Sequence, residues 1–290
     1  MYRLALLLVA WIVLPPSGFA QTPTFKFVRL DFPGAAETSA NGVNNAGVIV
    51  GSYVLNGHTH GFKLSNGRFT TIDIKGAQIT TVSAINDKGD LAGTFATNDL
   101  KSHGFILHGG AFTRLDFPGA VNGTVANGIN NSLTVVGTVD DVAGFIWSAG
   151  KSHKFLAPSD IGGATTLNGI SNLGRVVGDV FFSDFQRPFM FQGSDFDFLR
   201  PAGSLDLFVN GVNGRGDVVG CPVGTGSFLA FNPEAGESSS DKPDRFPALH
   251  TFKFPGASST CANGINFSRA IVGSYSDSLS HRHGFLAIVQ

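Results

Sequence analysis

The sequence is poor in charged residues, which make up only 14% of its 290 positions. Acidic and basic side chains nearly balance at a net charge of −1, and no block of Lys or Arg interrupts that balance. Proteins that bind the phosphate backbone of nucleic acids need such blocks. The composition therefore argues against nucleic acid as a partner.

Long apolar runs are missing beyond the N-terminus. There Arg3 precedes an apolar run at residues 4–14, and the small residues within 18–20 offer a cleavage site. The run is shorter than the ~20 residues of a membrane-spanning helix, and its order of parts is typical of a secretory signal peptide. We therefore expect residues 1–20 to be removed near Ala20 and the protein to be secreted or periplasmic, without a membrane span.

Cysteine is scarce, with Cys221 and Cys261 the two copies in the sequence. Thiols of an exported chain tend to oxidise, so a disulfide between them is one interpretation. The alternative is that both are small, buried apolar residues.

Glycine and phenylalanine are abundant instead, with 38 and 27 copies. Many short strands joined by tight turns have this composition, whereas solvated helices carry more charge. The composition predicts an all-β fold.

A unit of about 42 residues occurs six times. Its clearest part is the segment 41–51, Asn-Gly-Val-Asn-Asn-Ala-Gly-Val-Ile-Val-Gly, with counterparts that begin at residues 83, 127, 168, 210 and 263. The central apolar residues of consecutive units are separated by 42, 44, 41, 42 and 53 residues. The last interval contains a Ser-, Asp- and Pro-rich insertion at 232–247.

Each unit contains four strand-like runs, which in the first unit cover 38–44, 48–54, 60–64 and 68–74. Turns rich in Asn and Gly separate them. Four antiparallel strands every forty-odd residues are typical of a propeller blade. The sequence predicts one domain over residues 21–290, an all-β, six-bladed β-propeller with four-stranded antiparallel blades.

The two ends of the chain complement each other. Residues 25–35 match the end of a unit, as at 111–120, although they precede the first complete unit, and the chain stops on a third strand. We expect the N-terminal strand, residues 25–32, to close the last blade and so remove exposed sheet edges.

The repeats resemble the HAF-type family of probable extracellular repeat proteins, named for a His-Ala-Phe signature that follows a Gly-[Ile/Val]-Asn-x-x-Gly-x-[Val/Ile]-Val-Gly core. A version of the core is present in all six units, and the signature occurs as His-Gly-Phe at 60–62, 103–105 and 283–285. Units three to five keep the phenylalanine and lose the histidine, at 143–145, 187–189 and 226–228. The resemblance implies an extracellular location and a propeller-like architecture, and it supplies no catalytic residues.

The first strand of each unit should lie nearest the axis, where propellers commonly hold ligands. The repeat gives two rings of mostly small polar residues that we expect on one face of these strands, with Glu37 and Asp206 near the mouth. One ring is Asn41, Ser83, Asn127, Asn168, Asn210 and Asn263, and the other, nearer the top, is Thr38, Thr80, Thr124, Thr165, Leu207 and Thr260. A neutral polar funnel suits water, a sugar or another neutral ligand. The alternative is that these residues only satisfy crowded inner strands.

Two histidine pairs, His58 with His60 and His281 with His283, alternate so that both imidazoles of a pair can face one side, a spacing that metal sites use. Both pairs belong to the predicted top face, formed by the loops that join strand four to one and strand two to three. Units six and one are neighbours in a closed ring, so a shared metal site is one hypothesis. No acidic or cysteine ligand accompanies the pairs at a fixed spacing, and solvated loop histidines are the alternative. We predict no other cofactor.

Two functions follow from these features. The first is a non-catalytic extracellular scaffold that binds a glycan, peptide or surface partner through its top face or axis. The second is an axis-centred lyase, hydrolase or isomerase that uses Glu37, Asp206 or the loop histidines as acid and base. The sequence shows no Ser-His-Asp set and no paired carboxylates in matched positions, which favours the scaffold.

Overall fold

The computed structural model describes residues 22–99, 101–158, 163–182, 186–199, 207–222, 226–231 and 249–290. The expected signal peptide, the insertion at 232–247 and Asp206 lie outside these residues. Within the described part of the chain, no helix is long and apolar enough to cross a membrane.

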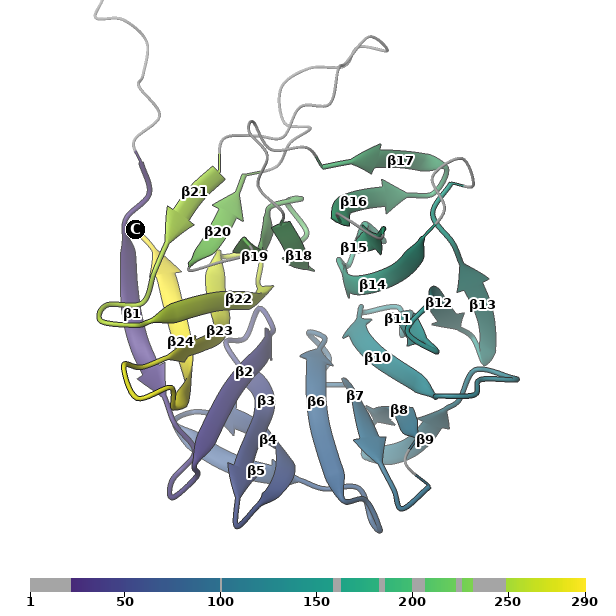
Figure 1. Ribbon diagram of the computed structural model, residues 1–290, viewed down its shortest axis with the longest axis horizontal. Coiled ribbons are helices and arrows are strands. Elements are labelled where there is room, and N and C mark those ends of the chain that lie inside the picture. The colour runs from purple at the N-terminus through teal and green to yellow at the C-terminus, as the bar shows by residue number, and fades with distance from the viewer. Residues whose placement is uncertain are drawn as a thin grey trace, which may run out of the picture.

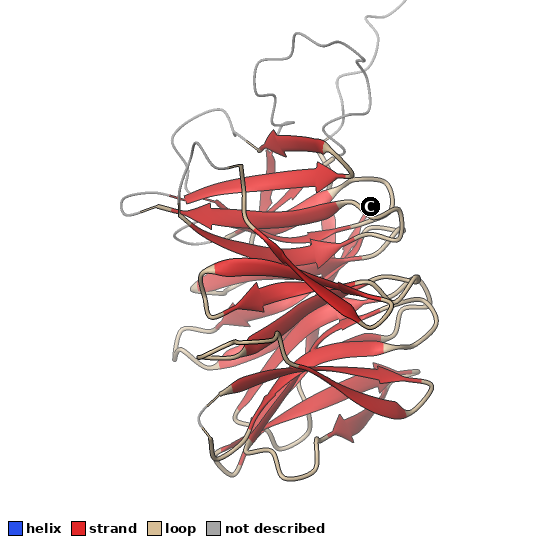
Figure 2. Ribbon diagram, turned by 90° about the vertical axis from the view of Figure 1, so that its right-hand side faces the viewer, coloured by secondary structure: helices blue, strands red, loops and turns tan. Residues whose placement is uncertain are grey.

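The chain folds into a β-propeller, with antiparallel sheets arranged as a ring around one axis (Figure 1). Seen from the side, the strands run between two faces that carry the loops (Figure 2). The predicted strands of the first unit agree with the observed ones to within two residues at each end. They are β2 (Glu37–Val43), β3 (Ile49–Leu55), β4 (His58–Ser65) and β5 (Arg68–Ile72).

The other five units follow the same order. The second unit has β6 (Ile79–Ile85), β7 (Leu91–Ala96), β8 (Ser102–His108) and β9 (Ala111–Leu115). The third has β10 (Thr124–Ile129), β11 (Val135–Val139), β12 (Ala143–Ser148) and β13 (Lys151–Phe155). The fourth has β14 (Ala164–Ile170), β15 (Val176–Phe181), β16 (Gln186–Gln192) and β17 (Asp195–Phe198). The fifth has β18 (Leu207–Val212), β19 (Val218–Pro222), β20 (Ser227–Ala230) and β21 (Leu249–Phe252), and the sixth has β22 (Ser259–Ile265), β23 (Ala270–Ser276) and β24 (Arg282–Val289).

The number of separate sheets differs from the expected six. Four sheets have four strands each, and a fifth has eight, because Thr59 of β4 pairs in parallel with Ile79 of β6. That pair joins the first and second units at a single position. Elsewhere in these two units the ladders between successive strands are antiparallel, as predicted.

The N-terminal strand β1 (Phe25–Leu30) lies on the outer edge of the last unit, as expected. It pairs antiparallel with β24 from Phe25 opposite Val289 to Leu30 opposite Gly284. The side chains of Phe25 and Phe27 pack against the hydrophobic cluster of that unit. The two ends of the chain therefore complete one sheet.

Each unit has a glycine in its second strand at a position where the packing leaves no room for a side chain. A Cβ atom at this glycine would overlap a backbone oxygen of the preceding strand, and it would lie only 2.6 to 3.0 Å from a phenylalanine ring of the third strand. The glycines are Gly51, Gly93, Gly137, Gly178, Gly220 and Gly273, and the rings above them are Phe62, Phe105, Phe145, Phe189, Phe228 and Phe285. These rings are at most 1% exposed, which confirms that the repeated phenylalanine is a core residue.

The asparagine that begins the turn between the first and second strands of a unit stabilises that turn. In the first unit, Asn44 Oδ1 accepts the backbone N–H groups of Ala46 and Val48 at 3.1 and 3.0 Å. The sequence did not indicate its second role, in which Asn44 Nδ2 donates to the backbone oxygen of Asn86 in the next unit at 3.1 Å. Five units make this inter-unit bond, and the donors are Asn44, Asn86, Asn130, Asn213 and Asn266.

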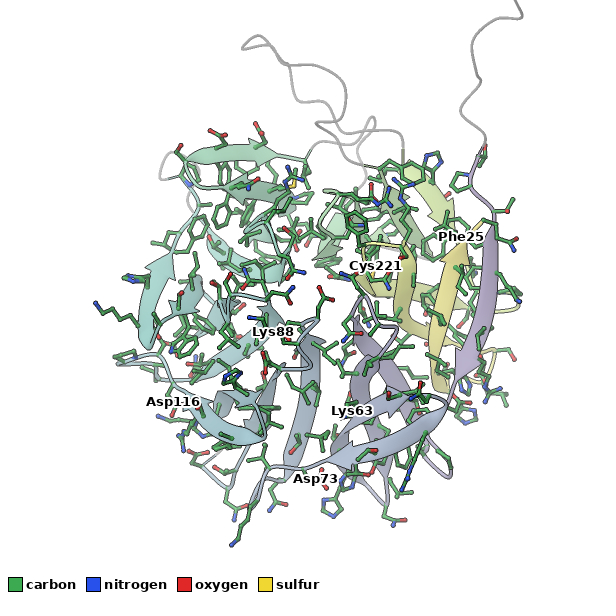
Figure 3. All side chains as sticks on the ribbon, turned by 180° about the vertical axis from the view of Figure 1, so that it is seen from behind. Phe25, Lys63, Asp73, Lys88, Asp116 and Cys221 are labelled. Atoms are coloured by element: carbon green, nitrogen blue, oxygen red, sulfur yellow. A yellow bond between two sulfur atoms is a disulfide. The ribbon has the colours of Figure 1, made fainter. Side chains whose placement is uncertain are left out.

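The two cysteines form a disulfide. Cys221 of β19 and Cys261 of β22 are bonded to each other, with their Cα atoms 5.1 Å apart. The bond links the fifth unit to the sixth near the axis (Figure 3).

Candidate functional site

The ring of inner asparagines lines a narrow axial cavity of about 80 Å³. Each asparagine side chain donates through Nδ2 to a backbone oxygen of the next unit at 2.9 to 3.0 Å. The donors are Asn41, Asn127, Asn168, Asn210 and Asn263. Ser83, the sixth member of the ring, also lines this cavity.

The threonine ring does not share that face, so the prediction of one common face was wrong. Thr38 and Asn41 are three residues apart, and alternate residues of a strand share a face. Ser39 is the neighbour that does so, because its Oγ donates to Asn41 Oδ1 at 2.9 Å.

The threonines instead fasten the loops that enter the first strands. Thr38 is 2% exposed, and its Oγ1 accepts the backbone N–H of Phe32 at 3.0 Å. The same bond recurs at Thr80, Thr124, Thr165 and Thr260, and Leu207 at the equivalent position is fully buried. These hydroxyl groups do not line the axial cavity.

Glu37 begins β2 and is exposed at the loop that precedes this strand. Glu37 does not line the axial cavity either, and Asp206 lies outside the described residues.

A wider axial cavity of about 240 Å³ opens on the face opposite the predicted top face. Its inner wall is an aliphatic ring at the ends of the first strands, formed by Val43, Ile85, Ile129, Ile170, Val212 and Ile265. Its rim is formed by the turns between the first and second strands. An apolar wall below a polar rim is the usual composition of a small-molecule site.

The turns at the rim carry one residue per unit at the position after the first residue of the turn, and we call these six residues the mouth ring. They are Asn45, Asp87, Asn131, Asn172, Gly214 and Phe267. Lys88, next to Asp87 in the chain, lies close to the centre of the ring (Figure 3).

The first four members form a head-to-tail chain of hydrogen bonds. The backbone N–H of Asn45 donates to Asp87 Oδ1, that of Asp87 to Asn131 Oδ1, and that of Asn131 to Asn172 Oδ1, each at 2.9 Å. Because the amide oxygens accept backbone protons, the orientation of the amide groups is fixed.

The amide nitrogens consequently converge on one carboxylate. Asn45 Nδ2 and Asn131 Nδ2 donate to Asp87 Oδ2 at 3.0 Å, and Asn172 Nδ2, from two units away, donates to it at 2.8 Å. Desolvation raises the pKa of Asp87, but hydrogen bonds from Asn45, Asn131 and Asn172 outweigh it and hold the pKa below its usual value. Asp87 is therefore a fixed negative charge at the rim.

The fifth and sixth units interrupt the mouth ring. Gly214 has no side chain, and Phe267 is 48% exposed. The guanidinium of Arg215 lies 4.4 Å from the centre of the Phe267 ring, a cation–π contact that holds this ring in place. We call the part of the rim formed by Gly214 and Phe267 the notch.

A buried acid lies beside the axis in the fourth unit. Asp179 is fully buried, and it accepts hydrogen bonds from Asn168 Nδ2 at 2.7 Å and from the backbone N–H of Val209 at 3.5 Å. Desolvation raises the pKa of Asp179 to about 7. Its equivalent in the second unit is Thr94, whose Oγ1 accepts the backbone N–H of Ala126 at 3.2 Å.

Replacing Asp179 with Thr is expected to stabilise the protein at pH 8 by a few degrees in Tm and to leave Tm unchanged at pH 4. The unfolded acid ionises near pH 3.8 and the folded one near pH 7, so the native state loses stability as pH rises between these values. Threonine keeps the hydrogen bond to the next unit and removes the charge. Thermal unfolding of both proteins from pH 4 to 8 measures the difference in Tm. Curves of Tm against pH that run parallel for the two proteins would contradict the raised pKa of Asp179.

The signature histidines are paired with aspartates, contrary to the sequence interpretation. His60 Nδ1 lies 3.0 Å from Asp73, and His103 Nδ1 lies 3.0 Å from Asp116. Both aspartates follow their histidine by 13 residues, beyond the end of the fourth strand, at the periphery of the ring (Figure 3).

The third pair crosses the closure of the ring. His283 Nδ1 lies 3.0 Å from Asp31, which follows β1, and its Nε2 lies 3.3 Å from Asp277. The pairing was missed because its two members stand at opposite ends of the chain. These contacts explain the signature histidines as ties between the third and fourth strands.

The other two histidines of the proposed metal site lie beside them. His58 is exposed, with its ring 6.5 Å from that of His60, and His281 Nδ1 lies 3.4 Å from Asp277. Among the described residues, no group of three or more His, Cys, Asp or Glu side chains is arranged to hold a metal ion.

The mouth ring was missed at the level of sequence. The repeat aligns its six positions, and the change from Asn or Asp to Gly214 and Phe267 is visible there. What the alignment does not show is that residues about 42 positions apart meet at one point.

No protein-family model and no curated protein matches the sequence. Three solved structures are similar in fold. One is a catalytically inactive variant of virginiamycin B lyase from Staphylococcus aureus solved with quinupristin, with 10% identity, a TM-score of 0.52, and coverage of 92% of this chain and 100% of the other. Another is YCF48 from Cyanidioschyzon merolae, with 8% identity, a TM-score of 0.51, and coverage of 91% and 98%. The third is the Aleuria aurantia lectin in complex with a fucosylated sugar, with 10% identity, a TM-score of 0.45, and coverage of 91% of both chains. The first two similarities show the β-propeller fold alone.

Proposed function

We propose that this protein is an exported, non-catalytic propeller of the HAF repeat type that binds an extracellular ligand, a glycan or a peptide, on its axis. In this proposal the eight-stranded sheet counts as two blades, since a single residue pair joins its halves, and the propeller has six blades. The observation that carries the proposal is the 240 Å³ axial cavity, in which one ionised carboxylate and several oriented amides stand above an aliphatic wall.

The side chains named for catalysis favour binding over reaction. Glu37 is exposed outside both axial cavities, and His60 and His283 are engaged by aspartates on the outer strands. Asp87 remains ionised and accepts four hydrogen bonds, so it is a poor proton donor.

A glycan array and a peptide array probed with the chain that starts at Gln21 test the proposal. We expect retention of a glycan or a peptide, released without chemical change. Binding should persist when Glu37→Gln and His283→Gln are combined, and metal analysis of the same sample should show no stoichiometric ion. Turnover of a retained compound, or its loss in this double variant, would favour the enzyme instead.

A further inference from the structure

The notch gives the mouth ring two different halves. On one side stand Asp87 and Asn172, which present a carboxylate and an amide, and on the other stand Gly214 and Phe267, which present bare backbone and an aromatic ring. All four residues line the same 240 Å³ cavity. A ligand in this cavity would therefore meet a polar and an apolar surface at once.

The missing side chain at position 214 exposes the aromatic surface. A Cβ atom placed on Gly214 would lie 3.4 Å from Cδ2 and 3.8 Å from Cε2 of Phe267, which is ordinary contact distance. Any larger side chain at 214 would thus cover these ring carbons. Their exposure to the cavity depends on the glycine.

Charges of both signs stand at or next to the rim. Asp87 is ionised, and the exposed cations Lys88 and Arg215 follow Asp87 and Gly214 in the chain, so no single sign of charge prevails near the cavity. Each amide has two N–H protons, and Asn172 spends one of them on Asp87. A hydroxyl group can donate to Asp87 Oδ1, which accepts one of the four bonds described above, and can accept the second amide proton of Asn172.

We infer that the notch binds one neutral sugar ring, whose C–H face packs on Phe267 and whose hydroxyl edge bonds Asp87 and Asn172. This inference rests on the proposed function and narrows its ligand. The cavity volume agrees with it, since 240 Å³ is below the ~300–1,000 Å³ of sites for drug-sized molecules. A single pyranose unit, free or at the end of a glycan, is of the right size.

The decisive variant is Gly214→Asn, which restores the residue type that three other units have at this position. The new side chain should fill the notch without harming the fold, because a Cβ atom at Gly214 meets only ordinary contacts with Phe267 and Gly214 has no positive φ. We expect titration with neutral monosaccharides at millimolar concentration to detect binding to the parent protein and none to the variant. Ser132→Asn is the matched control, since it adds the same side chain to an exposed turn outside the cavity and should bind as the parent does.

Two further variants separate the two halves of the site. Phe267→Ala should weaken sugar binding by about tenfold, the equivalent of one aromatic contact of ~1.4 kcal/mol. Asp87→Asn should weaken it similarly, because the charge on which the amides converge is removed. Unfolding curves check that each variant remains folded.

The outcomes distinguish the inference from the proposed function. Glycan binding that survives Gly214→Asn would overturn the notch and leave the binding propeller standing. Retention of peptides but no sugar by the parent protein would overturn the ligand class. If neither array yields a ligand, the proposed function fails and the inference with it.

Discussion

Removal of residues 21–32 is expected to unfold the whole ring rather than to trim one edge. β1 supplies six paired residues to the last sheet, and the rings of Phe25 and Phe252 stand 4.5 Å apart, centre to centre. Phe25, Phe27 and Leu30 are partly buried, so each contributes less than the roughly 1.5–3 kcal/mol of a fully buried side chain. Their loss adds to that of the strand pairing, and a domain is stable by only about 5–15 kcal/mol. We therefore expect no cooperative thermal transition from a chain that starts at Pro33.

The comparison needs a reference that keeps the strand. The chain that starts at Gln21 provides it, and Val28→Thr alters an outward side chain of β1, 41% exposed, without touching the pairing. Both should unfold in one transition at nearly the same Tm. A truncated chain with the Tm of the reference would show that closure of the ring does not depend on β1.

Replacement of Gly137 by Ala is expected to cost at least about 4 kcal/mol, the range reserved for severe core defects. The new methyl group would overlap the backbone oxygen of Val125 and lie 2.6 Å from Cε1 of Phe145. Phe145 is 1% exposed and has no room to retreat, and the oxygen belongs to the neighbouring strand. Either the two strands must separate or the side chain of Phe145 must move, and either change disrupts the third unit.

Gly214→Ala is the control for this prediction. The same methyl group at 214 meets only ring carbons of Phe267, at 3.4 Å or more. Denaturant unfolding should show a midpoint near that of the parent for Gly214→Ala and a large decrease for Gly137→Ala. Equal midpoints for the two variants would contradict the packing account of the repeat.

Features that depend on one repeat alone could be predicted from the sequence. The turn at Asn44, the buried Phe62 and the strand order of each unit follow from local chemistry that recurs at a fixed spacing. The closing strand was predictable as well, because residues 25–35 copy the end of a unit. The predicted insertion at 232–247 falls between β20 and β21, and its residues are outside the described part of the chain.

Features made between repeats could not be predicted in the same way. Asp87 meets Asn172 across 85 positions, and His283 meets Asp31 across 252. No local pattern marks such pairs, since each residue alone resembles an ordinary turn or loop residue. The prediction that Thr38 and Asn41 share one face of the strand was wrong for another reason. The two residues are three positions apart, and an odd separation puts side chains on opposite faces.

The hydrogen bonds of the turn asparagines link five of the six units to the next, and Asn266 of the sixth unit donates to the backbone oxygen of Asn44 in the first. A stack of solenoid repeats can grow or shrink by one member, because its ends are capped separately. Here a unit added or lost would leave a buried donor without its acceptor unless the circle closed again at a new diameter. Evolution by duplication of single units is thereby penalised, and stability becomes a property of the complete circle rather than a sum over its parts.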